Sequence, residues 1–481
     1  MSKWKLHTPK GVCDILPEEC VWKKEIESTI WSVFASMGYK EVELPTYEYY
    51  DVFAYSGGQI DQESMFKFFD EKGRILTLRP DITTSIARMT ATKENMDILP
   101  KRYCYTGNVF RAGETQGARL REFTQSGIEL IGSYAPEADA EVIAAAVEAI
   151  LAVGIEEFSV EIGQVAFFNG LVEQAGLDRE QTERLRERID SKDSLGISEL
   201  VSELDIDEGI KKLLSALPTL FGGVEILEKA DVQGLNETSK SALLNIKRIY
   251  ELLCLYGFEK YVSLDLGMLQ SIDYYTGSIF KCYTHGVGFP ICAGGRYDNL
   301  VGNFGVKAGA VGVAFGINRI MSALKSKGAP EVHDNSLTVI FPEFNAEGIA
   351  YDMAYTLRVN GCMVEGYIGG GDYTDCEEYC NKVKAGCMMR VYPNGKIQIK
   401  DFLKNEITET NANDFLGYYD DDCFDEDCDC GHHHEDDHDC GCGHHHSEDH
   451  ECKCGHHHED GHECECGHHH GEDHECKCKH H

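Results

Sequence analysis

Residues 102–132 read RYCYTGNVFRAGETQGARLREFTQSGIELIG, two strand-like runs on either side of an arginine-rich connection. In the runs 102–110 and 123–132, apolar, β-branched and aromatic residues alternate with polar ones, a pattern typical of half-buried strands. The arginines of the connection stand where guanidinium groups could hold a phosphate or a carboxylate. The stretch therefore predicts two strands of a sheet with a site for an anionic ligand beside them.

Elements on both sides of this stretch extend the same pattern. Apolar residues recur at helical spacing over 16–37, and the run 39–44 alternates before Pro45, so a helix followed by a strand is expected. Further strand-like runs lie at 75–78, 158–163, 262–267, 274–284 and 312–317, and an alanine-rich helix is expected over 137–151. Strands that follow one another with few helices between them predict an α+β fold, an antiparallel sheet flanked by helices.

Four regions differ in character along the chain. Residues 1–328 form the expected core, interrupted at 168–256 by a helical insertion in which leucine and charged residues dominate. A polar linker follows, and residues 335–410 then combine helix-like and strand-like runs as a small α/β domain. Residues 414–481 are an acidic, His/Cys-rich tail with almost no apolar side chain, so we expect it to be disordered without a ligand.

Composition and charge limit the function classes. The chain has 481 residues and a formal net charge of -37, and both the body and the tail are acidic. A nucleic-acid-binding surface normally shows clustered Lys and Arg, and because the sequence has no such cluster we expect no tRNA partner. Nor does it hold an apolar run of the roughly 20 residues that a membrane helix needs, or an N-terminal signal-peptide pattern. We therefore expect a cytoplasmic protein with no membrane segment.

The 21 cysteines fall into two groups. Those scattered through the body are best interpreted as small buried hydrophobes in a reducing compartment. Those of the tail, except Cys423, form Cys-x-Cys pairs at a strict period of 12, with histidine triplets between them. The candidate metal ligands are Cys428, Cys430, His432, His433, His434, Cys440, Cys442, His444, His445, His446, Cys452, Cys454, Cys464, Cys466, Cys476 and Cys478. Thiolate and imidazole together suit zinc, nickel or copper, although a merely solubilising tail has a similar composition.

Three segments resemble the motifs of class II aminoacyl-tRNA synthetases. They are SMGYKEVELP (36–45), FRAGETQGARLREF (110–123) and AGAVGVAFGINRI (308–320). The segments TLRPDITTSIAR (77–88), DYYTG (273–277) and AGGRYDNLV (293–301) are more specifically similar to histidyl-tRNA synthetase and to its non-catalytic paralogue, the regulatory subunit of ATP phosphoribosyltransferase. Residues 335–410 more loosely resemble the anticodon-binding domain of the synthetase. The resemblance implies a class II fold and a self-dimer formed through the first motif.

Departures from the synthetase pattern distinguish these two relatives. Gln270 stands where the synthetase has an arginine that stabilises charge as the histidine carboxylate attacks the α-phosphate, and removing one such donor typically costs on the order of a hundred- to a thousandfold in rate. Gly113 replaces the glutamate of the second motif, and Asn318 replaces the glutamate that precedes Arg319 in the third. Lost carboxylates imply lost adenine-side and magnesium contacts.

The histidine pocket of the synthetase is partly retained. The resemblance assigns these residues to candidate histidine contacts: Asp81, Thr83, Arg111, Arg119, Gln125, Glu129, Tyr274, Tyr275 and Arg296. Arg319 is a residual cation of the nucleotide site. A carboxylate pair such as Asp81 and Glu129 suits an α-ammonium group and an imidazole N–H, since both are hydrogen-bond donors. The alternative is that these polar residues are inherited with the fold and satisfy one another, and that Gly294 and Gly295 before Arg296 serve only a turn.

The sequence thus predicts a non-catalytic regulatory subunit that binds a short-form catalytic ATP phosphoribosyltransferase chain. On this reading L-histidine is the effector, the core needs no cofactor, and the tail holds a transition metal. Two alternatives stay open. One is a working or altered histidyl-tRNA synthetase, and the other is a metal-buffering protein whose synthetase-like body is an inert scaffold.

Overall fold

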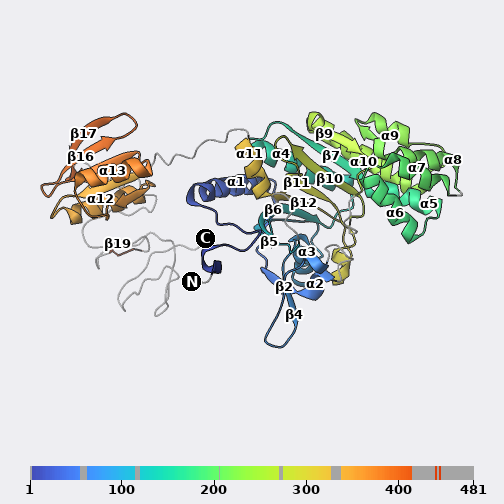
Figure 1. The fold of residues 1–481 in the computed structure, drawn as a ribbon, viewed down its shortest axis with the longest axis horizontal. Helices are drawn as coiled ribbons and strands as arrows, with labels where there is room; N and C mark the ends of the chain where they lie inside the picture. Colours follow the sequence, from blue (N-terminus) through green and yellow to red (C-terminus); the bar gives the residue numbers. More distant parts are fainter. Residues whose placement is uncertain are drawn as a thin grey trace, which may run out of the picture. The chain divides into compact units, whose positions relative to one another are not determined.

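The computed structural model describes residues 3–54, 62–113, 120–204, 206–269, 275–326 and 337–413, together with 439–440 and 444–445. The chain divides into two compact units, Met1–Glu331 and Val332–His481, and each has its own sheet (Figure 1). Among the described residues, no helix is long and apolar enough to cross a bilayer.

The first unit is built on a sheet that has nine strands in its described part, in the order β1-β5-β6-β12-β11-β10-β7-β9-β8. These are β1 (Lys40–Glu41), β5 (Lys101–Phe110), β6 (Glu122–Ile131), β7 (Phe158–Gln164), β8 (Phe221–Gly222), β9 (Val262–Asp265), β10 (Ser278–Thr284), β11 (Cys292–Arg296) and β12 (Ala310–Gly316). Only β1–β5 and β7–β9 pair in parallel among these strands. The predicted antiparallel sheet flanked by helices is therefore confirmed, with a parallel pairing toward each edge.

One face of the sheet is buried under long helices. The helices α1 (Pro17–Ser36) and α4 (Pro136–Ala152) agree with the predicted ranges, and each carries proline in its first turn, where the missing N–H costs nothing. They pack with α10 (Glu237–Leu255) and α11 (Ile317–Ser326) on alternate residues of the strands. The strand residues of this core include Cys104, Ile128, Leu130, Val160, Ile162, Phe280, Cys282, Cys292, Val311, Val313 and Phe315.

The opposite face of the same strands is lined by small residues. Because side chains alternate along a strand, the residues between the core positions point the other way. On this face the register aligns Gly127 with Tyr105 on β5 and Ala314 on β12, and it aligns Glu129 with Gly312 and then Gly295. The helices α3 (Thr83–Lys93) and η5 (Val301–Phe304) cover this face over β5. On β6, β11 and β12 the small residues of this face leave room for larger polar groups above the sheet. We call these small residues the glycine floor: Gly127, Gly295, Gly312 and Gly316, with Ala293 and Ala314.

The helical insertion extends from α5 to α10 and lies at one end of the sheet (Figure 1). Its helices are α5 (Val165–Ala175), α6 (Arg179–Asp190), α7 (Ser194–Ser202), α8 (Glu208–Ala216), α9 (Glu225–Ala230) and α10. Five of them begin at a side chain that accepts hydrogen bonds from the first turn: Gln164, Asp178, Asp193, Asp207 and Asn236. Such caps satisfy backbone donors that a helix leaves unpaired. The insertion also adds β8 to the edge of the sheet, next to β9.

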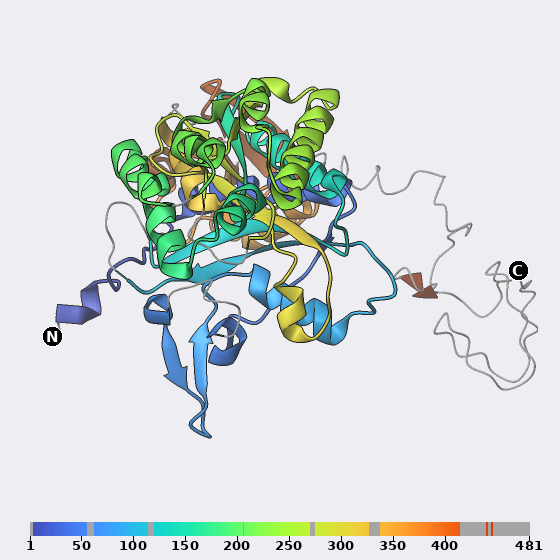
Figure 2. The ribbon, with the colours of Figure 1, turned by 90° about the vertical axis from the view of Figure 1, so that its right-hand side faces the viewer.

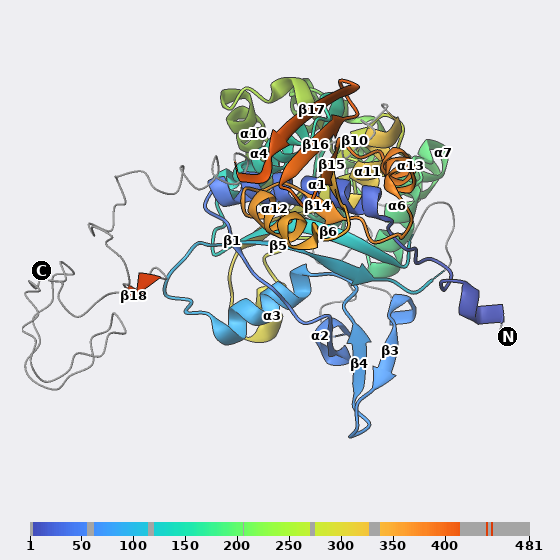
Figure 3. The ribbon, with the colours of Figure 1, turned by 90° about the vertical axis from the view of Figure 1, so that its left-hand side faces the viewer.

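A small sheet of order β2-β4-β3 lies on the side of β5 and β6 that faces away from α1 and α4 (Figure 3). Its strands are β2 (Tyr47–Tyr49), β3 (Lys67–Phe69) and β4 (Ile75–Leu78). The short helix α2 (Tyr50–Ala54) directly follows β2 along the chain. The β3–β4 hairpin projects from the body of the unit (Figure 2). Of this sheet, sequence periodicity predicts only 75–78, because the other two strands have three residues each.

The second unit has a sheet of order β14-β13-β15-β16-β17 in its described part. Its elements are β13 (Thr338–Pro342), α12 (Glu347–Val359), β14 (Val364–Gly366), α13 (Tyr373–Val383), β15 (Cys387–Val391), β16 (Lys396–Asp401) and β17 (Glu406–Asn411). The two helices pack in separate apolar clusters on the sheet. Ala412 is buried with the α12 cluster, so the packed part of this unit extends past residue 410. In the tail, β18 (Asp439–Cys440) pairs with β19 (His444–His445).

Candidate functional site

Glu129 lies at the centre of the glycine floor. Its side chain is 1% exposed, Thr83 Oγ1 donates to its Oε1 at 2.6 Å, and the Tyr297 hydroxyl donates to its Oε2. Burial, which disfavours the ionised form, raises the pKa of this carboxyl to about 8, and the two donated hydrogen bonds only partly oppose the shift. Nearby Asp81 raises it further. The group therefore titrates near neutral pH, where loss of its proton leaves an acceptor for a cationic or N–H-bearing ligand.

Glycines make room for the large residues of the site. A Cβ built on Gly312 would overlap Glu129 Oε2, and one on Gly127 would lie 2.5 Å from Tyr105 Oη. A Cβ on Gly295 would lie 2.8 Å from the ring of Tyr275. All three distances are shorter than ordinary contacts, so the glycines are a steric requirement for these side chains.

Asp81 precedes α3 and faces Glu129 from the chain above the sheet. Its Oδ1 accepts from the backbone N–H of Thr84 at 2.9 Å, and Oδ2 accepts from the Thr84 hydroxyl at 3.2 Å. Burial raises the pKa of the Asp81 carboxyl, although these hydrogen bonds and the charge of Arg111 oppose the shift. The structure thus brings Asp81, Thr83 and Glu129 together, as the resemblance implies.

Tyr275 and Gln125 also lie on the glycine-floor side of the sheet. Tyr275 packs against Met268 and Ile279 and stands over Gly295. Gln125 is half-buried on β6, two residues from Gly127 and on the same face. Both are therefore placed beside the carboxylates, and their contact with a ligand stays a prediction.

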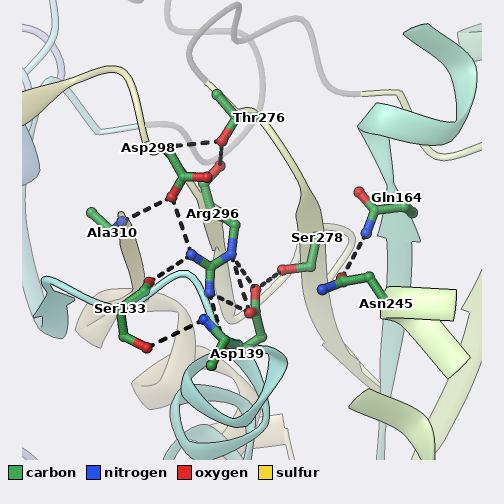
Figure 4. A network of polar contacts seen from close by, with 10 residues as sticks. Ser133, Asp139, Gln164, Asn245, Thr276, Ser278, Arg296, Asp298 and Ala310 are labelled. Atoms are coloured by element: carbon green, nitrogen blue, oxygen red, sulfur yellow. Dashed lines mark hydrogen bonds and ion pairs between the residues drawn. The ribbon is translucent and has the colours of Figure 1, made fainter. Parts of the chain in front are cut away.

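Arg296 is held inside the protein by a network of polar contacts (Figure 4). Its five N–H groups all have acceptors: both carboxylate oxygens of Asp139, the carbonyl oxygens of Ser133 and Ala135, and Asp298 Oδ1. Ser278 also donates to Asp139. This arrangement leaves Arg296 no N–H for a ligand, in contrast to the predicted histidine contact. The side chain instead anchors β11 to the start of α4.

A cavity of about 880 Å³ adjoins the site at the start of β6. Its lining includes three arginines and a lysine, two phenylalanines and the carboxylate of Glu19, which is paired with the lysine: Glu19, Arg111, Arg121, Phe123, Phe289, Arg319 and Lys325. Arg111 Nε donates to the Pro80 carbonyl at 3.0 Å, and Arg319 Nη1 donates to the Pro290 carbonyl at 2.7 Å. The cavity is positively charged in an otherwise acidic protein, and it suits an anionic ligand.

Asn318 also lines this cavity, and its Oδ1 accepts from the backbone N–H of Thr124 at 3.1 Å. This hydrogen bond joins the first turn of α11 to β6. The predicted residues Arg119, Gln270 and Tyr274 lie outside the described residues, as do the predicted metal ligands of the tail except Cys440, His444 and His445, of which only the backbone is described.

Two contacts of this site were not predicted from the sequence. Tyr297 donates to Glu129, and Tyr105 stands over Gly127 among the candidate residues. Strand alternation offered a signal for Tyr105, because it shares a face with Glu129 once β5 and β6 are paired. For Tyr297, the resemblance of the segment 293–301 places the residue near the amino acid together with Arg296, but its partner Glu129 lies 168 residues away and could not be predicted.

The fold and the arrangement of this site define a histidyl-tRNA synthetase-like protein of class II. The family model described as histidyl-tRNA synthetase matches residues 11–320. A solved structure of histidyl-tRNA synthetase from Nostoc sp., 22% identical, shares the fold with a TM-score of 0.71 over 85% of this chain and 98% of that chain.

Within this class, the chain belongs to the family of ATP phosphoribosyltransferase regulatory subunits. It is 45% identical to the protein of that name from Acetivibrio thermocellus over 86% of this chain and the whole of that relative. It is 42% identical to the one from Ruminiclostridium cellulolyticum, over 86% of this chain and 99% of that relative. A solved structure described as an ATP phosphoribosyltransferase regulatory subunit/histidyl-tRNA synthetase from Bacillus halodurans, 33% identical, matches with a TM-score of 0.71 over 80% of this chain and 97% of that chain.

The buried pair of Arg296 and Asp139 yields a stability prediction. We expect Arg296→Met to lower the free energy of unfolding of the first unit by about 3–5 kcal/mol, because Asp139, 0% exposed, loses the partner of its buried charge. Adding Asp139→Leu should recover part of this loss. The measurement is urea unfolding followed by circular dichroism.

The control is Arg102→Met, which breaks a paired but half-exposed contact with Glu141 on the same helix α4. This change should cost no more than about 1 kcal/mol. Equal losses in Arg296→Met and Arg102→Met would show that the buried network does not anchor α4 to β11.

Proposed function

We propose that this chain is the non-catalytic regulatory subunit of ATP phosphoribosyltransferase, acting with a short catalytic subunit in the first step of L-histidine biosynthesis. It activates that subunit and makes it sensitive to histidine. The observation that carries the proposal is the match to a curated regulatory subunit along its whole length. The protein acts in the cytoplasm, as a self-dimer assembled with catalytic chains.

The chemistry of the site supports histidine as the effector. Asp81 and Glu129 offer two neighbouring buried carboxyl groups, and an amino acid with an imidazole side chain offers an ammonium group and a ring N–H as donors to them. Gln270 takes the position at which the synthetase resemblance places a charge-stabilising arginine, so binding need not lead to adenylate formation. The ligand acts by linkage: histidine binds one state of the assembly more tightly, with a coupling of about 1–3 kcal/mol.

Mixing the purified chain with a short-form catalytic subunit tests the proposal directly. We expect phosphoribosyltransferase activity to appear only in the mixture and to fall when histidine is added. Glu129→Ala should retain activation and lose inhibition, because it removes an effector contact that lies within the chain. The assay is release of pyrophosphate with ATP and phosphoribosyl pyrophosphate as substrates.

Two results would contradict the proposal. One is a mixture no more active than the catalytic subunit alone. The other is histidine-dependent ATP–pyrophosphate exchange by this chain at an ordinary synthetase rate, which would instead support the alternative of a working histidyl-tRNA synthetase.

The raised pKa of Glu129 predicts a pH-dependent affinity. A carboxyl with a pKa of about 8 is about half ionised at pH 8 and about one-tenth ionised at pH 7, so an interaction that needs the carboxylate weakens about fivefold over that unit. The dissociation constant of histidine, measured by isothermal titration calorimetry, should rise accordingly as the pH is lowered. Glu129→Gln accepts hydrogen bonds at any pH and should lose this dependence. A wild-type affinity that does not change between pH 8 and 7 would exclude the ionised Glu129 as a ligand contact.

We further propose that the tail is a separate binding segment for transition metal, zinc, nickel or copper. The specific observation is the repeated unit of a Cys-x-Cys pair followed by three histidines, at a period of 12 residues. The soft thiolates and the imidazoles of one unit supply enough ligands for a four-coordinate ion.

Truncation after Asn413 tests this second function, since Ala412 is part of the packed unit and a cut at residue 410 would remove it. The full chain should bind several equivalents of zinc that the truncated chain does not, as measured by metal analysis after dialysis. Activation and histidine inhibition should be equal in both. If the truncated chain failed to activate the catalytic subunit, the tail would be part of the regulatory function instead.

A further inference from the structure

Tyr105 projects from β5 over the glycine floor. In the register of β5 and β6 it stands opposite Gly127, and its hydroxyl would lie 2.5 Å from a Cβ at that position. The phenol ring is therefore laid across the sheet, which only a glycine beneath it permits. This places the hydroxyl beside the carboxyl groups of Asp81 and Glu129, whose charges both affect Tyr105.

The hydroxyl of Tyr105 is a buried polar group without a partner in the described part of the chain. The side chain is 3% exposed, and its Oη has no hydrogen bond among the described residues. Thr83 lies next to it, but outside hydrogen-bonding geometry, and the Thr83 hydroxyl already donates to Glu129 at 2.6 Å. A buried hydroxyl that gives up water without gaining a partner is unfavourable, so its presence calls for an explanation.

We infer that Tyr105 is a specificity-determining residue that donates a hydrogen bond to a ring nitrogen of the effector. The inference rests on the proposed function, because it takes histidine as the ligand of this site. Burial keeps the phenol protonated, since it raises the pKa of Tyr105 well above its usual range. Tyr105 is thus a donor, whereas the ionised Glu129 two residues beyond Gly127 is an acceptor.

One donor and one acceptor on the same floor match a neutral imidazole. That ring carries one nitrogen with a proton and one with a lone pair, so it can donate to Glu129 and accept from Tyr105. A ring of similar size without a basic nitrogen leaves the Tyr105 hydroxyl buried and unpaired. The site therefore selects imidazole over a thiophene or benzene ring by hydrogen bonding as well as by shape.

The test compares wild type with Tyr105→Phe, which removes the hydroxyl and keeps the ring. We expect the dissociation constant of L-histidine to rise about tenfold, the effect of one hydrogen bond. The affinity for β-(2-thienyl)-L-alanine should stay the same, so that preference for histidine falls by the same factor. The melting temperature without ligand should be unchanged or up to about 3 °C higher, because a buried group without a partner is gone.

Tyr103→Phe is the matched control. Tyr103 lies on the same strand and face, is 6% exposed and also has a hydroxyl without a partner among the described residues, but that hydroxyl faces Thr90 and Glu94. This variant should bind histidine as the wild type does.

The outcomes distinguish a wrong effector from a wrong role for Tyr105. If the wild type does not bind histidine, the proposed effector is wrong. If the wild type binds histidine and Tyr105→Phe binds it equally well, the inference about Tyr105 is overturned. A melting temperature lowered in Tyr105→Phe, with unchanged ligand preference, would also overturn it and would show the hydroxyl to be a structural contact.

Discussion

The site depends on the absence of a side chain at Gly312. The Glu129 carboxylate occupies the space that a Cβ at this position would fill, and Tyr105 relies on Gly127 in the same way. These pairs follow from the register of the neighbouring strands β5, β6 and β12. On these strands the core residues face α1 and α4, and the residues between them lie on the face of the glycine floor. A large apolar core on one side and a buried polar site on the other are thus two results of a single alternating pattern.

Much of this arrangement could be predicted because it is local in sequence. Strand alternation and helical periodicity identified β5, β6, α1 and α4 to within about two residues. Asp81, Thr83 and Glu129 were placed by resemblance, and the structure brings them into contact range. The role of Arg296 could not be predicted, because its acceptors are a helix start and a loop about 160 residues earlier in the chain. Tertiary partners of this kind leave no pattern in a single sequence.

The proposed regulatory role gives a physical reason for a site that, by the resemblance to the synthetase, has kept its carboxylates and has Gln270 in place of a cation. An enzyme directs binding energy toward a transition state, whereas a regulator needs only that its two states differ in affinity. Buried groups such as Glu129, with a pKa near 8, are suited to this because small changes in their surroundings alter their charge. The neighbouring cavity carries Arg111 and Arg319, so cationic side chains line the space beside these carboxyl groups.

The pairing of β6 with β12 has a consequence for biosynthesis of the protein. Glu129 and Gly312 are neighbours in the sheet, although the whole insertion lies between them in sequence. At ribosomal elongation rates, β12 is made roughly 10–35 s after β6. Throughout that interval the nascent chain holds a carboxyl-bearing strand with one open edge, which is prone to pair with other chains. That edge is closed only once β12, the last strand of the floor along the chain, has been made.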